Sequence, residues 1–263
     1  MISYPHIDPV IIGIGPLQVR WYGLMYVMGF MATYFLVRHQ IQKRGLKKLE
    51  AHFENINMML IICLVLGGRL GYVLFYNFSY YMENPLEILA TWHGGMSFHG
   101  ALIGIVVSGY VYAKLKKLDY WEGADVYAVT TPIGLGLGRI GNFINGELFG
   151  RTTDVPWAMV FPGGGPYPRH PSQLYECFLE GVVLFTILWI LKDRKWPSGT
   201  MLSFYLILYG IFRWFIELFR EPDANLGFVL GPLTMGQLLS TVMIVAGTAL
   251  FFYRRKVAPI AII

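Results

Sequence analysis

Long apolar stretches separated by short polar connections recur along the whole chain. Each stretch is about 20 residues long, which is enough for a helix to cross the hydrocarbon core of a bilayer. The pattern therefore predicts an all-α integral membrane protein, a single polytopic membrane domain over residues 1–263 with about seven transmembrane helices. The predicted spans are residues 19–37, 56–76, 96–113, 124–145, 172–191, 199–219 and 232–253.

The composition agrees with a membrane protein and argues against a soluble one. Hydrophobic residues make up 55% of the chain and charged residues only 14%, whereas soluble domains carry about 25% charged residues. The two cysteines, Cys63 and Cys177, both lie inside apolar runs and are too few for a disulfide scaffold. We interpret both as packing residues.

Basic residues collect on one side of the predicted membrane. Every lysine and several arginines follow the first, third, fifth or seventh span. By the positive-inside rule this side is the cytoplasm, so the N-terminus lies outside and the C-terminus lies in the cytoplasm. The glycine- and proline-rich connection at about 146–171 then forms a small periplasmic head segment. The net charge of +5 reflects topology and predicts no nucleic-acid partner.

Three arginines interrupt the apolar spans. Arg69, Arg139 and Arg213 fall inside the second, fourth and sixth spans, where a charge at the bilayer centre costs at least about 2.5–3.5 kcal/mol. Counted from the cytoplasmic ends, they lie about 12–15 residues in, or roughly 18–22 Å along a helix. All three are therefore expected in the outer half of the bilayer.

Other polar residues gather at the same depth. His99 lies just inside the outer end of the third span. Asn142 is one turn beyond Arg139 on the same helix face, and Glu147 follows at the exit of that span. In the sixth span, spacings of 4, 4 and 3 residues place four polar side chains on one stripe: Tyr209, Arg213, Glu217 and Arg220.

Each of these residues also has a purely structural interpretation. A single arginine such as Arg69 often snorkels to the interface, a lone His99 is commonly a structural residue, and Arg213 with Glu217 makes a structural ion pair. Their convergence at one depth favours a binding site instead. The sequence predicts a surplus of positive charge there, which suits the phosphodiester of an outer-leaflet phospholipid because guanidinium groups match phosphate oxygens.

Metal and serine-hydrolase motifs do not occur in the sequence. There is no zinc-ligand spacing, no acidic cluster near the arginines that would hold Mg²⁺, and no Gly-x-Ser-x-Gly turn. The sequence therefore predicts neither a metal ion nor a cofactor.

Six motifs, in order along the chain, resemble the bacterial prolipoprotein diacylglyceryl transferases. The longest is Gly138-Arg-Ile-Gly-Asn-Phe-Ile-Asn-Gly-Glu-Leu-Phe-Gly-Arg151. The others are Trp21-Tyr-Gly-Leu-Met-Tyr26, Gly67-Gly-Arg-Leu-Gly-Tyr72, Gly94-Gly-Met-Ser-Phe-His-Gly100, Arg169-His-Pro-Ser-Gln-Leu-Tyr-Glu176 and Tyr209-Gly-Ile-Phe-Arg-Trp-Phe-Ile-Glu217.

The resemblance implies an enzyme of the bacterial inner membrane that acts in lipoprotein biosynthesis. Such a transferase moves the diacylglyceryl group of phosphatidylglycerol to the thiol of the lipobox cysteine of a prolipoprotein. A thioether forms and glycerol-1-phosphate leaves. The partners implied are phosphatidylglycerol, the prolipoprotein signal peptide and membrane lipids, and a monomer is expected. The active site would face the periplasmic leaflet.

The reaction needs a stabilised phosphate leaving group and a thiol that loses its proton. Arg139 and Arg213 are the candidates for the phosphate. His99 is the candidate base, either taking the thiol proton or mainly positioning the lipid, and Glu147 is the fourth candidate catalytic residue. The candidate phosphatidylglycerol-binding residues are Tyr22, Arg69, Arg139, Asn142, Tyr209, Arg213 and Glu217.

A phospholipid transporter or flippase that uses the same arginines is the alternative. Transporters are often built from internal repeats, and Gly68-Arg-Leu-Gly71 echoes Gly138-Arg-Ile-Gly141 in spans of the same direction. The echo is only four residues long, so the transferase remains the leading interpretation.

Overall fold

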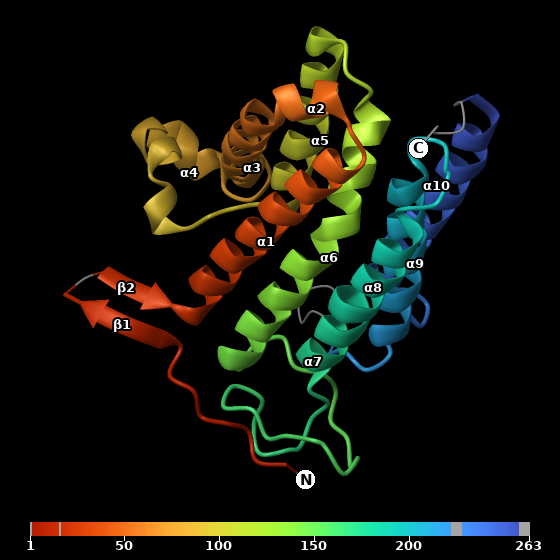
Figure 1. The fold of residues 1–263 in the computed structure, drawn as a ribbon. Coiled ribbons are helices and arrows are strands. Elements are labelled where there is room, and N and C mark those ends of the chain that lie inside the picture. The colour runs from red at the N-terminus through yellow and green to blue at the C-terminus, as the bar shows by residue number, and fades with distance from the viewer. Residues whose placement is uncertain (1, 16, 222–227, 258–263) are drawn as a thin grey trace. The chain divides into compact units, whose positions relative to one another are not determined.

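The computed structural model describes residues 2–15, 17–221 and 228–257, and it is mostly helical (Figure 1). The chain divides into two compact units. The large unit comprises residues 1–39 and 124–263, and the small unit comprises residues 40–123. The two boundaries fall inside helices α1 (Trp21–Lys43) and α6 (Tyr120–Ile144).

A helix occupies each of the predicted spans. Besides α1 and α6, these are α3 (Phe53–Phe75), α5 (Phe98–Lys116), the composite helix α7–η3–α8 (Ser172–Glu176, Cys177–Val183, Leu184–Leu191), α9 (Thr200–Ile216) and α10 (Met235–Val257). Within the described residues, four of them are long and apolar enough to cross a membrane: α3, α5, the composite helix and α10. The helical fold class is confirmed, while the count of seven spans and the orientation stay predictions.

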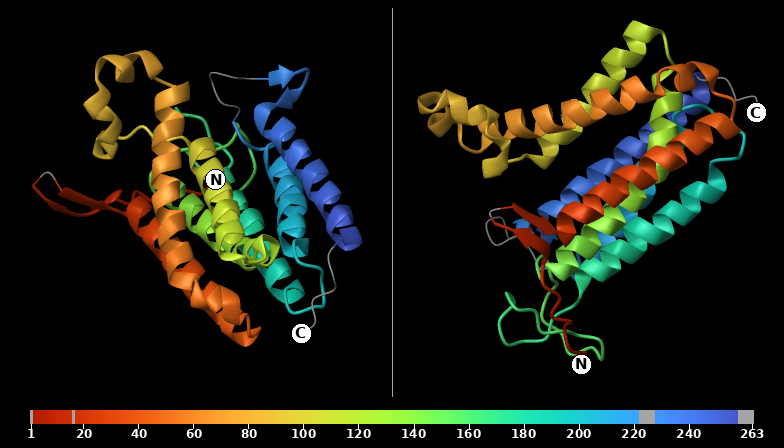
Figure 2. Two further views of the ribbon diagram at one scale, coloured as in Figure 1. Left: turned by 90° about the horizontal axis from the view of Figure 1, so that it is seen from above. Right: turned by 60° about the vertical axis from the view of Figure 1, so that its left-hand side comes forward.

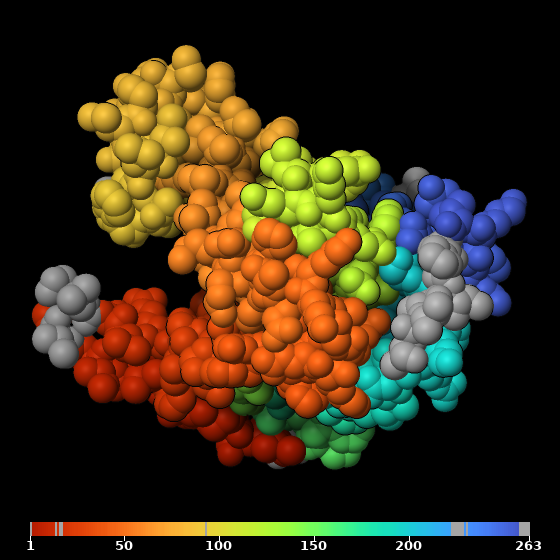
Figure 3. Space-filling model, turned by 45° about the horizontal axis from the view of Figure 1, so that its top comes forward, coloured from red at the N-terminus to blue at the C-terminus, as the bar shows by residue number. Residues whose placement is uncertain are grey.

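The remaining elements are short. An antiparallel hairpin pairs β1 (Val10–Ile14) with β2 (Leu17–Arg20), and a smaller one pairs β3 (Phe228–Leu230) with β4 (Leu233–Thr234). In the small unit the short helices are α2 (Lys47–Ala51), α4 (Phe78–Glu83), η1 (Pro85–Leu89) and η2 (Thr91–His93). The surface of α4, η1 and η2 carries exposed apolar side chains, Leu86 and Trp92 among them, and is drawn in gold in Figure 3.

Glycines bring helix backbones together in both units. In the small unit, a Cβ built on Gly67 would lie 2.5 Å from the carbonyl oxygen of Gly100, so α3 and α5 meet backbone to backbone. In the large unit, α9 and α10 pack side by side (Figure 2), and a Cβ on Gly210 would lie 2.7 Å from the side chain of Ile244. Side chains larger than hydrogen at these positions would separate the helices.

The contact between α6 and the composite helix is equally close. A Cβ built on Gly181 would lie 2.8 Å from the Cα of Gly136. Asp125 links the other end of α6 to α9, because its carboxylate accepts hydrogen bonds of 2.8 Å from the backbone N–H groups of Gly199 and Leu202. This interaction caps the N-terminal end of α9. Together the contacts hold α6, the composite helix and α9 as one packed group.

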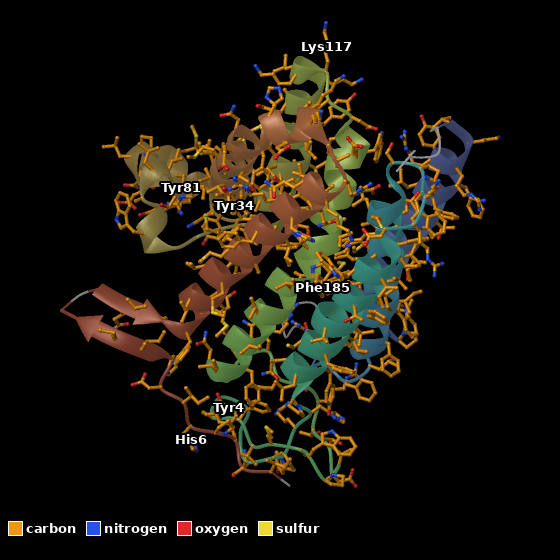
Figure 4. All side chains as sticks on the ribbon, in the orientation of Figure 1. Tyr4, His6, Tyr34, Tyr81, Lys117 and Phe185 are labelled. Carbon is orange, nitrogen blue, oxygen red and sulfur yellow. The ribbon has the colours of Figure 1, made fainter. Side chains whose placement is uncertain are left out.

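The predicted head segment, residues 146–171, is irregular and is held by isolated bridges and a small apolar cluster. Thr152 and Met159 each bridge to Arg169. Tyr4, from the start of the chain, packs on Met159 and Phe161 and donates a hydrogen bond of 2.7 Å from its hydroxyl to the carbonyl of residue 143 (Figure 4). The N-terminal residues therefore help to build this segment.

Candidate active site

Glu176, the last residue of α7, lies at the centre of a group of arginines. Its side chain is fully buried and contacts three guanidinium groups. Arg139 Nε lies 2.7 Å and Arg213 Nη1 2.9 Å from Oε2, while Arg220 Nη1 lies 3.3 Å from Oε1. We call the following six residues the arginine–glutamate cluster: Arg139, Glu176, Glu180, Arg213, Glu217 and Arg220.

The helix packing explains why these groups meet. Arg139 follows Gly136 by three residues on α6, so the close approach of Gly136 and Gly181 brings the guanidinium within reach of the composite helix. Arg213 and Glu217 are four residues apart and form an ion pair of 2.8 Å between Nη2 and Oε2. The cluster thus joins α6, the composite helix and α9 within the large unit.

Glu217 is held from two sides. Besides the ion pair with Arg213, its Oε1 accepts a hydrogen bond of 3.1 Å from the hydroxyl of Thr234 at the end of β4. Gly236 leaves the space for this carboxylate, because a Cβ there would lie 2.6 Å from the Glu217 carboxyl carbon. The predicted ion pair between Arg213 and Glu217 is therefore present, and the hydrogen bond from Thr234 ties Glu217 to the residue just before α10.

A second chain of contacts leads from Arg139 to Glu147. Arg139 Nη1 donates to Asn142 Oδ1 at 3.4 Å, and Asn142 Nδ2 donates to Glu147 Oε1 at 2.8 Å. Asn145 also donates to Glu147 Oε1, at 3.1 Å, and Gln173 donates to the backbone carbonyl of Glu147 at 2.6 Å. The sequence-predicted residues Arg139, Asn142 and Glu147 are thus brought together.

Both predicted tyrosines also lie close to these groups. Tyr22 of α1 packs against Gly141, next to Asn142, since a Cβ on Gly141 would lie 2.8 Å from the Tyr22 ring. Its hydroxyl is 3.0 Å from that of Tyr26. Tyr209 stands one turn before Arg213 on α9 and interacts electrostatically with Arg213, Arg139 and Glu180.

Arg69 and His99 belong to the small unit. Arg69 is 4% exposed, so it does not snorkel to a solvated surface. Its guanidinium donates to backbone carbonyls, at 2.9 Å to Ile88 and 3.0 Å to Gly95, and further to the carbonyls of Glu87, Ala90 and Gly94. His99, in the first turn of α5, is exposed.

Two acids that the sequence analysis did not count among the site residues lie beside the arginines. Glu176 and Glu180 are both fully buried there, and Glu176 pairs with three guanidinium groups. Sequence reasoning included Glu176 only inside a motif and did not consider Glu180. Two acidic residues four positions apart in an otherwise apolar stretch were the available signal, since carboxylates in such stretches require partners.

An apolar hollow of about 410 Å³ lies on the composite helix and α9. Several of its lining residues are neighbours in sequence of cluster residues. Among them are Tyr175, Leu179 and Phe219. His170 also lines the hollow, and burial lowers the pKa of its imidazole, which favours the neutral ring. An apolar hollow of this kind suits the apolar part of an amphiphile.

The chemistry available to the cluster is anion binding and proton transfer. Three guanidinium groups on two helices and one loop offer several N–H donors for phosphate oxygens, and three carboxylates can exchange protons. Over the described residues, no group of three or more His, Cys, Asp or Glu side chains could hold a metal ion.

Comparisons with known proteins identify the family. The sequence matches the model of the prolipoprotein diacylglyceryl transferase family over residues 9–253. A relative from Desulfotalea psychrophila is 61% identical over 258 residues, covering 96% of this chain and 95% of that protein. A relative from Geobacter sulfurreducens is 53% identical, covering 98% and 100%, and one from Photobacterium profundum is 48% identical, covering 98% and 97%. All three are named phosphatidylglycerol–prolipoprotein diacylglyceryl transferase.

Proposed function

The chain belongs to the prolipoprotein diacylglyceryl transferase family, and from this premise we propose that its arginine–glutamate cluster is the catalytic site. The protein is a transferase that acts on phosphatidylglycerol and a prolipoprotein. The acceptor is the thiol of the lipobox cysteine. The sulfur forms a bond to the glyceryl carbon, the carbon–oxygen bond breaks, and glycerol-1-phosphate leaves with the electron pair on oxygen.

The meeting of three guanidinium groups on one carboxylate, Glu176, carries this proposal. A site that already holds a buried carboxylate between Arg139 and Arg213 has the charge and donor geometry to accept a second oxyanion. The two arginines differ in whether a terminal nitrogen remains available for the phosphate. Both terminal nitrogens of Arg213 already contact carboxylates, whereas Arg139 contacts Glu176 through Nε and retains a terminal amino group for the phosphate.

The other residues have supporting roles in the proposal. Asn142 and Glu147 orient the glycerol head group, because their hydrogen-bond chain starts at Arg139. Glu217 positions the guanidinium of Arg213. Tyr22 and Tyr209 shape the lipid cavity beside the arginines.

His99 remains the candidate base for the thiol proton, or the residue that positions the lipid. Arg69 serves the site indirectly. Its donors are engaged by backbone carbonyls of residues 87–95, so it fixes the segment that leads into α5 and His99. In this role Arg69 would not contact the phosphate itself.

The transfer reaction can be tested with the purified protein, phosphatidylglycerol and a synthetic lipobox peptide. A mass increase of the peptide by one diacylglyceryl group, with release of glycerol phosphate, is expected. No adduct, together with movement of labelled lipid between leaflets of a vesicle, would favour the transporter instead. The names of the relatives do not favour that alternative.

The membrane arrangement completes the proposal. The protein forms one polytopic domain of about seven spans in the bacterial inner membrane, with the N-terminus and the active site toward the periplasm, and acts as a monomer. A cysteine replacing Leu115 should react with a membrane-impermeant thiol reagent only after the membrane is opened. A cysteine replacing Gly164 should react in intact spheroplasts. The reverse pattern would place the arginines near the inner leaflet and contradict the arrangement.

A further inference from the structure

Glu180 is a buried acid whose place in the proposed reaction is unassigned. It lies in η3, a π-helical stretch from Cys177 to Val183. Its side chain is fully buried, and within the described part of the chain neither carboxyl oxygen has a hydrogen-bond partner. Its closest ionic contact is Arg213 Nη1, 3.9 Å from Oε1, and that nitrogen already contacts Glu176 at 2.9 Å.

An ionised carboxylate in this position would be poorly compensated. Burying a charge without hydrogen bonds is costly, and a neutral acid avoids most of that cost. Glu176, one turn earlier, takes the arginine donors that would otherwise stabilise Glu180. When two carboxylates share a site, repulsion leaves one of them protonated.

The groups that face Glu180 come from every neighbouring element. The titratable or charged side chains that interact with it are Arg139 of α6, Glu176 of α7, Tyr205, Tyr209 and Arg213 of α9, and Arg220 just beyond α9. With Glu180 neutral and Glu176 and Glu217 ionised, the three arginines leave one net positive charge. That charge complements the single negative charge of a phosphodiester.

We propose that Glu180 carries a proton in the resting protein and donates it to the departing phosphate oxygen. This inference rests on the proposed function. As the sulfur–carbon bond forms and the carbon–oxygen bond breaks, the electron pair goes to oxygen and the Glu180 proton follows it. The product leaves as a singly charged phosphate monoester. The base then releases the proton that it took from the thiol, and the Glu180 carboxylate takes up one proton, so atoms and charges balance over one turnover.

The π-helix supports this assignment. Its wider turn displaces residues relative to an α-helix, and such stretches are frequent at functional sites. Here the stretch begins immediately after Glu176 and contains Glu180, so both acids are presented to Arg213.

Infrared spectroscopy combined with Glu180→Gln tests the proposal. The wild-type protein at neutral pH should show the carbonyl stretch of a protonated carboxylic acid, and Glu180→Gln should lose it. The exposed residue Glu83 provides the control, since Glu83→Gln should keep the signal. A wild-type protein without such a signal, or a Glu180→Gln protein that retains it in full, would overturn the proposal. The wild-type spectrum shows whether a protonated carboxylic acid is present even if the variant does not fold.

Kinetics supply the second measurement. Glutamine has the shape and charge of the neutral acid, so Glu180→Gln should bind phosphatidylglycerol vesicles with an affinity close to that of the wild type. Its transfer rate should fall by about 10²-fold or more, the scale of general acid catalysis. Glu180→Asp should recover part of the rate, and its pH profile should keep the alkaline decline that Glu180→Gln lacks. A rate for Glu180→Gln near that of the wild type would refute the inference. An inactive wild-type protein would instead refute the proposed function.

Discussion

Arg69 in the small unit and Arg139 in the large unit are both shielded guanidinium groups, but their partners differ in charge. Arg69 donates to neutral backbone carbonyls of residues 87–95, whereas Arg139 contacts the carboxylate of Glu176. Neutral carbonyls belong to the fold and cannot leave without unfolding the segment. Arg139 keeps a terminal amino group beside its contact with the Glu176 carboxylate, and a phosphate has the charge and geometry to bind there. The first arrangement serves structure, and the second can bind substrate.

The largest effect is expected for Glu176→Gln, which removes the charged partner of three arginines at once. Breaking a buried ion pair by removing one partner costs about 3–5 kcal/mol. Thermal unfolding in detergent should therefore begin well below the wild-type temperature. The control is Glu221→Gln, since Glu221 is 49% exposed and pairs with Arg169 at 2.9 Å at the surface; its unfolding should barely change. Equal effects in the two variants would show that burial of the cluster contributes little.

The next largest effect concerns the arginines that contact carboxylates. Arg139→Lys and Arg213→Lys should each reduce the transfer rate by about 10²-fold or more, the scale for one preorganised charge stabiliser. Lysine presents one compact ammonium group and loses the wide planar fork with which these guanidinium groups reach partners through separate nitrogens. Rates on a lipobox peptide should be compared at matched protein level, with the exposed residue Arg194 replaced by Lys as the control. A near-normal rate for Arg139→Lys would assign the phosphate to another group.

A smaller effect on the rate is expected for Arg69→Lys. The ammonium group can keep some of the carbonyl hydrogen bonds but not all, so the free energy of unfolding should fall by about 1–3 kcal/mol. Limited proteolysis should then cut within residues 84–97 before it cuts elsewhere, while the transfer rate falls less than for Arg139→Lys. An inactive but stable Arg69→Lys protein would reverse the comparison and make Arg69 the phosphate ligand.

No effect is expected from chelation. The anion is held by guanidinium groups in this proposal, and a divalent ion has no part in it. Transfer should survive extensive treatment with a chelator. Loss of the rate with recovery upon addition of a divalent ion would mean that a metal, rather than Arg139 and Arg213, carries the phosphate.

The apolar pattern of the sequence located the helices well, because helix formation in such stretches depends on length and local composition. The pairing of Arg213 with Glu217 and the proximity of Arg139 and Asn142 were predictable for the same reason, since both pairs lie on one helix. These features depend only on local spacing.

Contacts between segments far apart in the chain were not predictable. Glu176 meets Arg139 because Gly136 and Gly181 let two helices touch, and no spacing rule reports that. The partners of Arg69 are backbone carbonyls. Every residue has one, so the sequence does not reveal which of them an arginine contacts. The π-helix around Glu180 leaves no signature in residue type or spacing either, so its effect on the direction of the side chain was invisible.

The position of Glu176 in the chain has a consequence for the order of biosynthesis. Helix α6, which carries Arg139, is not among the four segments that are long and apolar enough to cross a bilayer by themselves within the described residues. Ribosomes complete α6 before they reach Glu176, so the nascent helix holds an unpaired arginine that costs about 2.5–3.5 kcal/mol at the bilayer centre. The carboxylate that lowers this cost arrives only with the composite helix. We therefore expect α6 to settle in the membrane late, together with the segment made after it, and nascent chains that end before Glu176 to leave α6 incompletely inserted.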